Sequence, residues 1–240
     1  MKFYICDDLP ESFFTAVFDA YKERDCVITS DSEIQLSLGC ETVRVHSDIE
    51  KCGRVLRGLK KCDVDAEYDI ALALRSCDKQ KEQICFAYIK RLFEWKKPIK
   101  NAYNMPEVVD LNNILYKITG EAHRMKGFLR FKETAGGVMY APYSPDNDIT
   151  DMLMPHFVAR LNMPFIIHDI KRQIAGLYNG NEWIITCIGD AEICLSENER
   201  AFETLWKKYY KAVNIKERPH EKQMKGSMPV RYWKFLPEKN

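Results

Sequence analysis

Several motifs that mark well-known protein classes are missing from these 240 residues. No two of the nine cysteines form a Cys-x-x-Cys pair, so the sequence shows neither a zinc knuckle nor a loop that binds an iron–sulfur cluster. There is no Walker loop, no Gly-x-Gly-x-x-Gly, no Gly-x-Ser-x-Gly and no His-Glu-x-x-His. These absences exclude most enzyme classes that short motifs identify. We therefore expect no cofactor and no metal site.

Long apolar runs are missing as well. The longest stretches, such as Met163–His168, are far too short to cross a bilayer. Asp7 and Asp8 stand where a signal peptide would need its apolar segment. We expect a cytoplasmic protein that does not engage a membrane. Seven of the nine cysteines lie in the first 85 residues, and we interpret them as reduced thiols packed as small apolar side chains.

The composition is that of a globular protein, with 46% hydrophobic and 30% charged residues. It excludes collagen-like, low-complexity and largely disordered chains. The net charge of +1 hides an asymmetry: residues 1–85 carry −5, residues 86–206 carry −1 and residues 207–240 carry +7. A basic tail suits attraction to phosphates or to an acidic partner, but it also suits a solvated helix and arm. Charge alone favours the second interpretation.

Apolar periodicity predicts a small α/β portion at the N-terminus, followed by a helical middle. A capping box at Ser47–Glu50 predicts the start of one helix, and Gly127 predicts the end of another. No linker rich in glycine, serine or proline separates the parts, although Lys96–Asn101 offers a boundary. We therefore predict domains at 1–97 and 98–240, or one continuous domain. The predicted strands are Lys2–Cys6, Glu33–Leu38 and Thr42–Val45, and the predicted helices are Pro10–Lys22, 47–60, 65–77, 80–96 and 106–125.

Beyond Gly127 the pattern changes to short extended segments. Thr134–Gly137 is typical of a hairpin turn, and Asn179-Gly180 is typical of a tight turn. The predicted order is β-β-α-β-β-β, an antiparallel sheet with flanking helices, which indicates an α+β fold rather than a doubly wound sheet. The predicted strands are 128–132, 138–142, 164–169, 174–179 and 182–188, and the predicted helices are 149–161 and 197–213.

Histidines and cations supply the candidate chemistry. His156 and Arg160 are four residues apart on a predicted helix and share one face. His156 is a candidate general acid or base, or a partly buried histidine that only packs beside Phe157. His123 and Arg124 at a helix end are either functional or complement the helix dipole.

Other cations are candidate phosphate contacts. Phe128, Arg130 and Lys132 share a face of a predicted strand, as in surfaces that stack bases and hold phosphates. Arg172 either binds phosphate or closes a turn by pairing with Asp169, and the second interpretation is favoured. The remaining phosphate candidates are in the basic tail, where Tyr232 and Trp233 are expected to pack on the domain: Lys207, Lys208, Lys211, Arg231 and Lys234.

Together, several stretches resemble a bacterial family described as probable DNA metabolism or repair proteins. The resemblance spans nearly the whole chain, although Phe165 stands where many members have tryptophan. It implies a role around DNA lesions, beside a radical-SAM repair protein or a uracil-DNA-glycosylase-type domain, neither of which this sequence contains. The stretches that carry it are Phe13–Tyr21, His123–Phe131, His156–Arg160, Pro164–Arg172, Gly176–Gly180 and Met228–Pro237.

Three functions follow from these observations. The first is an accessory protein that binds DNA and presents it to a repair enzyme. The second is an enzyme acting on nucleic acid or nucleotides, with His156 or His123 as acid or base. The third is a scaffold that docks repair proteins through the acidic front and the aromatic tail.

Overall fold

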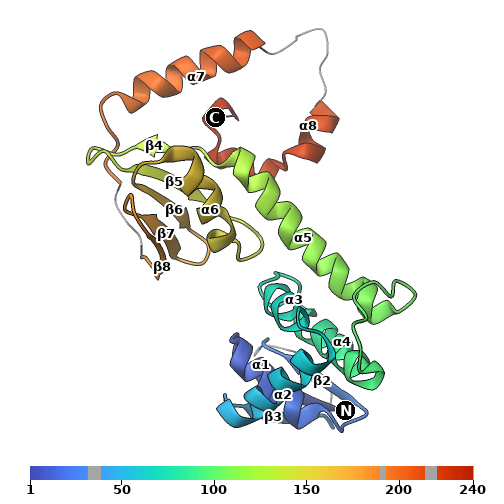
Figure 1. Ribbon diagram of the computed structural model, residues 1–240. Coiled ribbons are helices and arrows are strands. Elements are labelled where there is room, and N and C mark those ends of the chain that lie inside the picture. The colour runs from blue at the N-terminus through green and yellow to red at the C-terminus, as the bar shows by residue number, and fades with distance from the viewer. Residues whose placement is uncertain (32–38, 190–192, 214–220, 240) are drawn as a thin grey trace. The chain divides into compact units, whose positions relative to one another are not determined.

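The computed structural model describes residues 1–31, 39–189, 193–213 and 221–239. Its contacts divide the chain into two compact units, Met1–Thr119 (unit 1) and Gly120–Asn240 (unit 2). The division falls inside helix α5 (Pro106–Phe128) (Figure 1). The domain boundary expected at 97/98 stays a prediction.

Unit 1 contains a small parallel sheet. Its strands β1 (Lys2–Cys6), β2 (Cys26–Thr29) and β3 (Glu41–Val45) lie in the order β2-β1-β3. Helix α1 (Pro10–Ala20) buries Phe13, Phe14 and Val17, as its apolar spacing predicts. The predicted strand at 33–38 lies outside the described residues.

Three further helices complete the part of unit 1 before α5: α2 (Ile49–Cys62), α3 (Ala66–Ala73) and α4 (Lys81–Trp95). The capping box predicted from Ser47 is one residue early, because the Asp48 carboxylate accepts the 3.0 Å hydrogen bond from the Lys51 N–H and so caps α2. From α4, the Gln83 side-chain oxygen accepts from the Ile28 N–H on β2 at 3.0 Å. The Gln83 side chain thereby satisfies a backbone N–H group of the edge strand β2.

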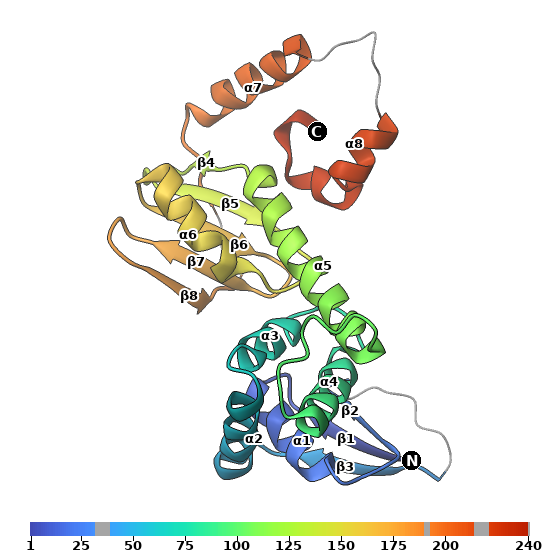
Figure 2. The ribbon, with the colours of Figure 1, turned by 45° about the vertical axis from the view of Figure 1, so that its right-hand side comes forward.

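Unit 2 is built on a five-stranded sheet in the order β4-β5-β6-β7-β8, with α6 (Thr150–Leu161) on one face (Figure 2). The α+β class is confirmed, and the elements of the sheet follow the predicted β-β-α-β-β-β order, although the first strand is not the segment predicted. The sheet is mixed rather than antiparallel, because α6 is a crossover that brings β6 alongside β5 in parallel. The strands are β4 (Lys132–Glu133), β5 (Met139–Tyr143), β6 (Phe165–Asp169), β7 (Ile174–Tyr178) and β8 (Trp183–Cys187).

Both predicted turns are confirmed. The 134–137 turn joins β4 to β5, with the Thr134 N–H donating to the Val138 carbonyl at 3.0 Å and Gly137 at a φ of 74°. The Asn179 side chain accepts from the backbone N–H groups of Asn181 and Glu182, and Gly180 has a φ of 104°. Positive φ at both positions explains why glycine is needed there.

The predicted strand over 128–132 is wrong. Helix α5 continues to Phe128, and the Leu129 N–H still donates to the Met125 carbonyl at 3.1 Å. Leu129 is buried, and the centroid of the Phe128 ring lies 6.1 Å from that of the Tyr232 ring. An apolar run of this kind suits helix and strand equally, and these tertiary contacts favour the helix. Phe128, Arg130 and Lys132 therefore share no strand face.

In the described residues after the sheet, the chain forms two helices and two short 3-10 helices. They are α7 (Glu199–Val213), α8 (Glu221–Ser227), η1 (Val230–Phe235) and η2 (Pro237–Lys239). Tyr232 is buried and Trp233 is half-buried, which agrees with the expectation that these side chains pack on the domain, and Leu236 is buried as well. Within the described ranges, no helix combines the length and apolarity that a membrane crossing requires.

Candidate functional site

A groove of about 1000 Å³ lies between α7 and the body of unit 2. The rest of its lining comes from the end of α5, the chain to β4, β4 itself, Met139 of β5, the end of α6 and Pro237. Its aromatic lining residues are Phe131, Phe157, Phe202, Trp206 and Tyr209, its basic ones are Lys126, Arg130, Lys132 and Arg160, and its acidic ones are Glu133, Glu199 and Glu203.

The inner wall of the groove is aromatic. The Phe131 ring centroid lies 4.9 Å from that of Phe157 and 5.7 Å from that of Phe165, in tilted and edge-on arrangements typical of packed aromatic side chains. Phe165 is fully buried and also contacts Tyr178. It therefore packs beneath the groove and offers no face on which a ligand could stack.

The outer wall is the apolar face of α7. Its members follow helical spacing, yet Phe202, Leu205 and Tyr209 are about 60% exposed. Trp206 is held more firmly, because its indole N–H donates to Glu238 Oε2 at 2.8 Å and the Arg130 guanidinium lies 5.5 Å from its ring. This helix therefore presents unburied rings to the groove.

Two groove cations are neutralised within the fold. Arg130 donates to Glu238 Oε1 at 2.7 Å and to the Gly127 carbonyl, and Lys132 pairs with Glu203. Burial of Glu238 raises the pKa of its carboxyl, but the hydrogen bonds from Arg130 and Trp206 outweigh burial and the pKa is lowered overall. Glu238 therefore stays ionised at neutral pH.

Two other cations are free. Lys126 and Arg160 line the groove and form no ion pair or hydrogen bond with any described residue. They are close enough to His156 that their charges affect its titration. Burial lowers the pKa of His156 below its ordinary value, and Lys126 and Arg160 lower it further. Two cations without an ion-pair partner among the described residues thus lie close to His156, whose lowered pKa favours the neutral imidazole at pH 7.

The two candidate catalytic histidines lie in different surroundings. His156 packs edge-on against Phe157 at 4.9 Å, and its Nε2 is buried without a hydrogen-bond partner among the described residues. His123 is exposed on α5 and is not part of the groove lining. Arg124 is half-buried on α5, with its Nε buried and unpaired within the described chain. The role of these three residues stays a prediction.

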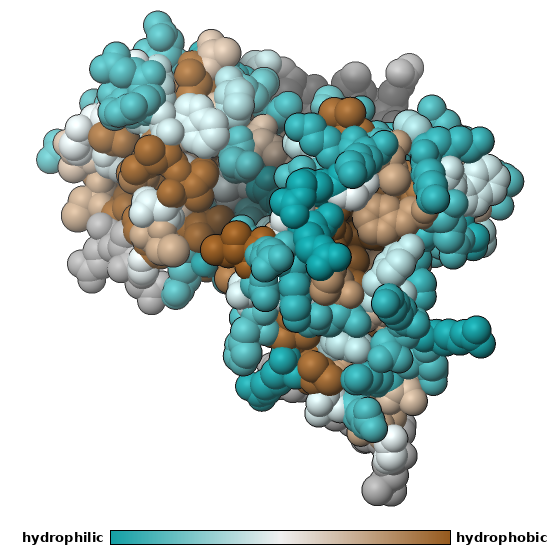
Figure 3. Space-filling view, turned by 60° about the horizontal axis from the view of Figure 1, so that its bottom comes forward, coloured by the Kyte–Doolittle hydropathy of each residue, from teal (hydrophilic) through white to brown (hydrophobic). Residues whose placement is uncertain are grey.

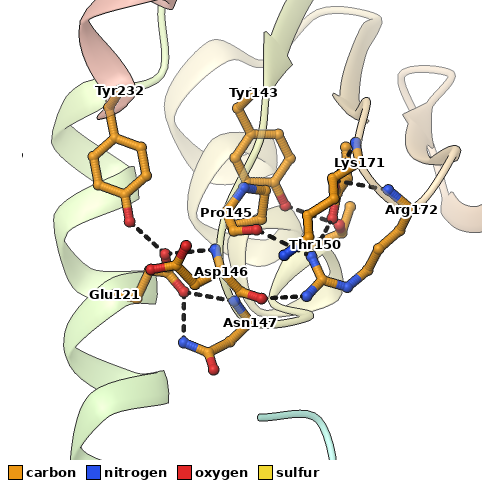
Figure 4. Close-up of polar contacts among 10 residues, drawn as sticks. Glu121, Tyr143, Pro145, Asp146, Asn147, Thr150, Lys171, Arg172 and Tyr232 are labelled. Carbon is orange, nitrogen blue, oxygen red and sulfur yellow. Dashed lines mark hydrogen bonds and ion pairs between the residues drawn. The ribbon is translucent and has the colours of Figure 1, made fainter. Parts of the chain in front are cut away.

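The candidate phosphate contacts Arg172 and Arg231 belong to a separate network centred on Glu121. Figure 4 shows Arg172 and Glu121 in this network. Arg172 pairs with Asp169 at 2.8 Å, as the turn-closing interpretation expects, and donates to the Pro145 and Asp146 carbonyls. Arg231 pairs with the Asp146 carboxylate at 2.6 Å. Both guanidinium groups thus have intramolecular partners that a phosphate would have to displace.

Glu121 was not among the residues that sequence reasoning selected. Its buried carboxylate accepts from the Asp146 and Asn147 backbone N–H groups, both at 2.9 Å, from the Asn147 side chain at 2.6 Å, and from the Tyr232 hydroxyl. Burial raises the pKa of Glu121, but these hydrogen bonds lower it further than burial raises it. One signal was available: Glu121 lies on the apolar stripe of α5 that includes Ile114, Ile118 and Met125.

The remaining candidates lie on two surfaces. Lys208 and Lys211 are exposed on α7 and Lys207 is half-buried there, and none of the three lines the groove. Lys234 is exposed on η1, with its ammonium 4.7 Å from the Phe235 ring. Among the described residues, no three histidine, cysteine, aspartate or glutamate side chains are grouped as a metal site would require.

Comparison with known proteins identifies the family of this chain. Residues 79–238 match the model of a domain of unknown function (DUF4130), while no curated protein matches the chain. The matched range contains every residue that lines the groove. Because it covers two thirds of the sequence, the chain belongs to the family of this domain of unknown function.

Proposed function

We propose that the protein is a nucleic-acid-binding accessory factor of DNA metabolism or repair, and that the groove of unit 2 holds single-stranded DNA. The observation that carries the proposal is the juxtaposition of unburied aromatic rings on α7 with the unpaired cations Lys126 and Arg160. Aromatic platforms beside positive charge are the general means by which proteins bind single strands.

The α7 rings favour single strands over duplex. Trp206 and Tyr209 have ring centroids 5.7 Å apart, and both line the groove. Stacking one base on such a ring is worth about 1–3 kcal/mol. In duplex DNA the base faces are already stacked on one another, so only the bases of an unpaired strand can stack on the α7 rings.

The cations supply the phosphate contacts. Lys126 and Arg160 have no carboxylate partner, so binding a phosphate there breaks no ion pair. Arg130 and Lys132 first have to leave Glu238 and Glu203. We therefore assign the first backbone contacts to Lys126 and Arg160, and secondary contacts to the paired residues.

Lesion chemistry is assigned to a partner. The candidate base His156 has its Nε2 buried and does not line the groove. A radical-SAM repair protein or a glycosylase-type enzyme, as the family resemblance implies, would supply the reaction. This protein would supply the bound strand.

The test is fluorescence anisotropy with labelled single- and double-stranded DNA, including uracil-containing oligonucleotides, across a salt series. We expect tighter binding of single strands, with affinity falling as salt rises because phosphate contacts release counterions. Running the products on a denaturing gel separates an accessory factor from an enzyme. No binding at low salt overturns the proposal.

A double charge reversal assigns the site. Lys126→Glu with Arg160→Glu should reduce the slope of log affinity against log salt by about 1.4, at about 0.7 per phosphate of a single strand. The matched control is Arg57→Glu with Lys60→Glu, which reverses one arginine and one lysine on exposed positions of α2. Equal losses in the two variants would show that net charge, and not the groove, determines binding.

A further inference from the structure

Strand β8 forms an open edge of the unit 2 sheet. It pairs with β7 on one side, and no described segment pairs with it on the other. Trp183, Ile184 and Ile185 are 39%, 56% and 40% exposed. Figure 3 shows one face of the molecule, on which hydrophobic residues gather in an exposed patch.

The hydrogen-bond register identifies the free backbone groups. At the two ends of the ladder, the Asn179 N–H donates to the Glu182 carbonyl and the Ile188 N–H donates to the Gln173 carbonyl. Counting inward from these two pairs, every second residue pair of β7 and β8 is hydrogen-bonded. In an antiparallel ladder this places the N–H and C=O groups of every second residue on the outer side. In β8 those residues are Trp183, Ile185 and Cys187, and β7 satisfies none of their backbone groups.

This edge also lacks the features that normally protect one. Exposed edge strands usually carry a charged residue, a proline or a bulge that prevents pairing with another chain. The five residues Trp183–Cys187 contain neither charge nor proline, and their pairing with β7 runs without a bulge. They also include tryptophan, isoleucine and threonine, which favour extended pairing.

We propose that β8 pairs antiparallel with β8 of a second copy of this chain, about a two-fold axis through Ile185. That register places Trp183 opposite Cys187 of the second copy and Ile184 opposite Thr186. It uses all three outward-facing residues of each strand, so each of the three residue pairs exchanges two hydrogen bonds. Such a contact is isologous and closes after two copies.

Charge is compatible with this register. The nearest described charge is Glu182, which would lie opposite Ile188 of the second copy, so no like charges face each other. An acidic or basic peptide would find no partner charge along Trp183–Cys187. A second copy therefore fits the edge better than a charged peptide.

The first experiment measures the mass of the full chain by sedimentation equilibrium over a range of concentrations. We expect a dimer for the wild-type protein and for Ile170→Lys, which adds the same charge at an isoleucine that is 44% exposed outside β8. Ile185→Lys should be monomeric, because two lysines would meet at the axis. A wild-type mass of one chain at every concentration, or a dimeric Ile185→Lys, overturns the proposal.

The second experiment tests the register without a disruptive charge. Directly opposed residues of a hydrogen-bonded pair have Cα atoms about 5.5 Å apart, within the range of a disulfide. Ile185→Cys should therefore form a reducible cross-linked dimer beyond any formed by the native cysteines of the wild-type protein. Thr186→Cys should not, because its two copies lie about 7–8 Å apart on the diagonal. Equal cross-linking at both positions contradicts the register.

Discussion

The Glu121 carboxylate shows how one buried residue joins distant parts of a unit. It is 1% exposed and receives hydrogen bonds from the segment before α6 and from η1. A buried charge is tolerated only when its oxygens are satisfied, and removing the charge leaves several donors without an acceptor. Glu121 therefore fixes the position of the C-terminal segment on α5.

Replacing this carboxylate should destabilise the protein. In Glu121→Gln the amide NH2 would face donors, and we expect a loss of about 1–3 kcal/mol in the free energy of unfolding at pH 7. Urea denaturation followed by tryptophan fluorescence measures this loss. Glu182→Gln, at an exposed position, is the control and should leave the midpoint unchanged.

The same residue predicts a pH dependence with a definite sign. The pKa of Glu121 is lowered in the folded state, so its contribution is fully present above the ordinary value of 4.5 and is lost as the pH falls through the folded value. Wild-type stability should therefore fall more steeply than that of Glu121→Gln below about pH 4.5. Parallel pH profiles for the two proteins would contradict this account.

At this scale, local pairs are predictable from sequence and distant ones are not. The Asp169–Arg172 pair was predicted because the two residues are three apart around a turn. The partners of Glu121 are 25, 26 and 111 residues away, so only its place on an apolar stripe could have indicated burial. Lys132 was selected for its charge, but its pairing with Glu203 depends on where α7 packs.

At the scale of elements, α7 both provides the groove and restrains it. The helix contributes exposed aromatic rings to the groove, while the carboxylate of its own Glu203 pairs with the Lys132 ammonium group. A carboxylate in this position competes with phosphate for the same ammonium group. The acidic side chain should therefore lower the affinity for any anion that binds beside β4.

Removing that competition should strengthen DNA binding. Glu203→Gln frees Lys132 from a half-buried ion pair. Surface ion pairs are worth about 0.2–1 kcal/mol, so we expect an increase in affinity of up to about fivefold. Anisotropy at fixed salt measures the change. Glu197→Gln removes the same charge from an exposed position just before α7 and should have a smaller effect. Identical gains would assign the effect to net charge.

Elements with a strong period were predictable, and their pairing was not. The apolar stripe of α1 and the Asn179-Gly180 turn depend on neighbours in sequence. The Phe128–Lys132 run suits helix and strand alike, and contact with Tyr232 and burial of Leu129 decide in favour of helix. The parallel pairing of β5 with β6 follows from the path of α6 across the sheet, which no local signal records.

At the scale of unit 2, the two proposed surfaces occupy opposite edges of one sheet. The groove is lined by β4, and the free backbone groups belong to β8. Four strand spacings of about 4.8 Å separate these edges, or about 19 Å. Sites this far apart with no shared partners are expected to behave additively.

The two surfaces should therefore fail separately. Ile185→Lys should abolish the dimer and leave the affinity of each chain for single-stranded DNA within about twofold, since changes at independent sites add to within about 0.3–0.5 kcal/mol. The Lys126→Glu and Arg160→Glu pair should lower that affinity and leave the dimer mass unchanged. Sedimentation and anisotropy on the same preparations measure both quantities. No residue of β8 lines the groove of its own chain. If Ile185→Lys lost DNA binding but kept its fold by circular dichroism, two copies of the protein would therefore have to hold the DNA strand jointly.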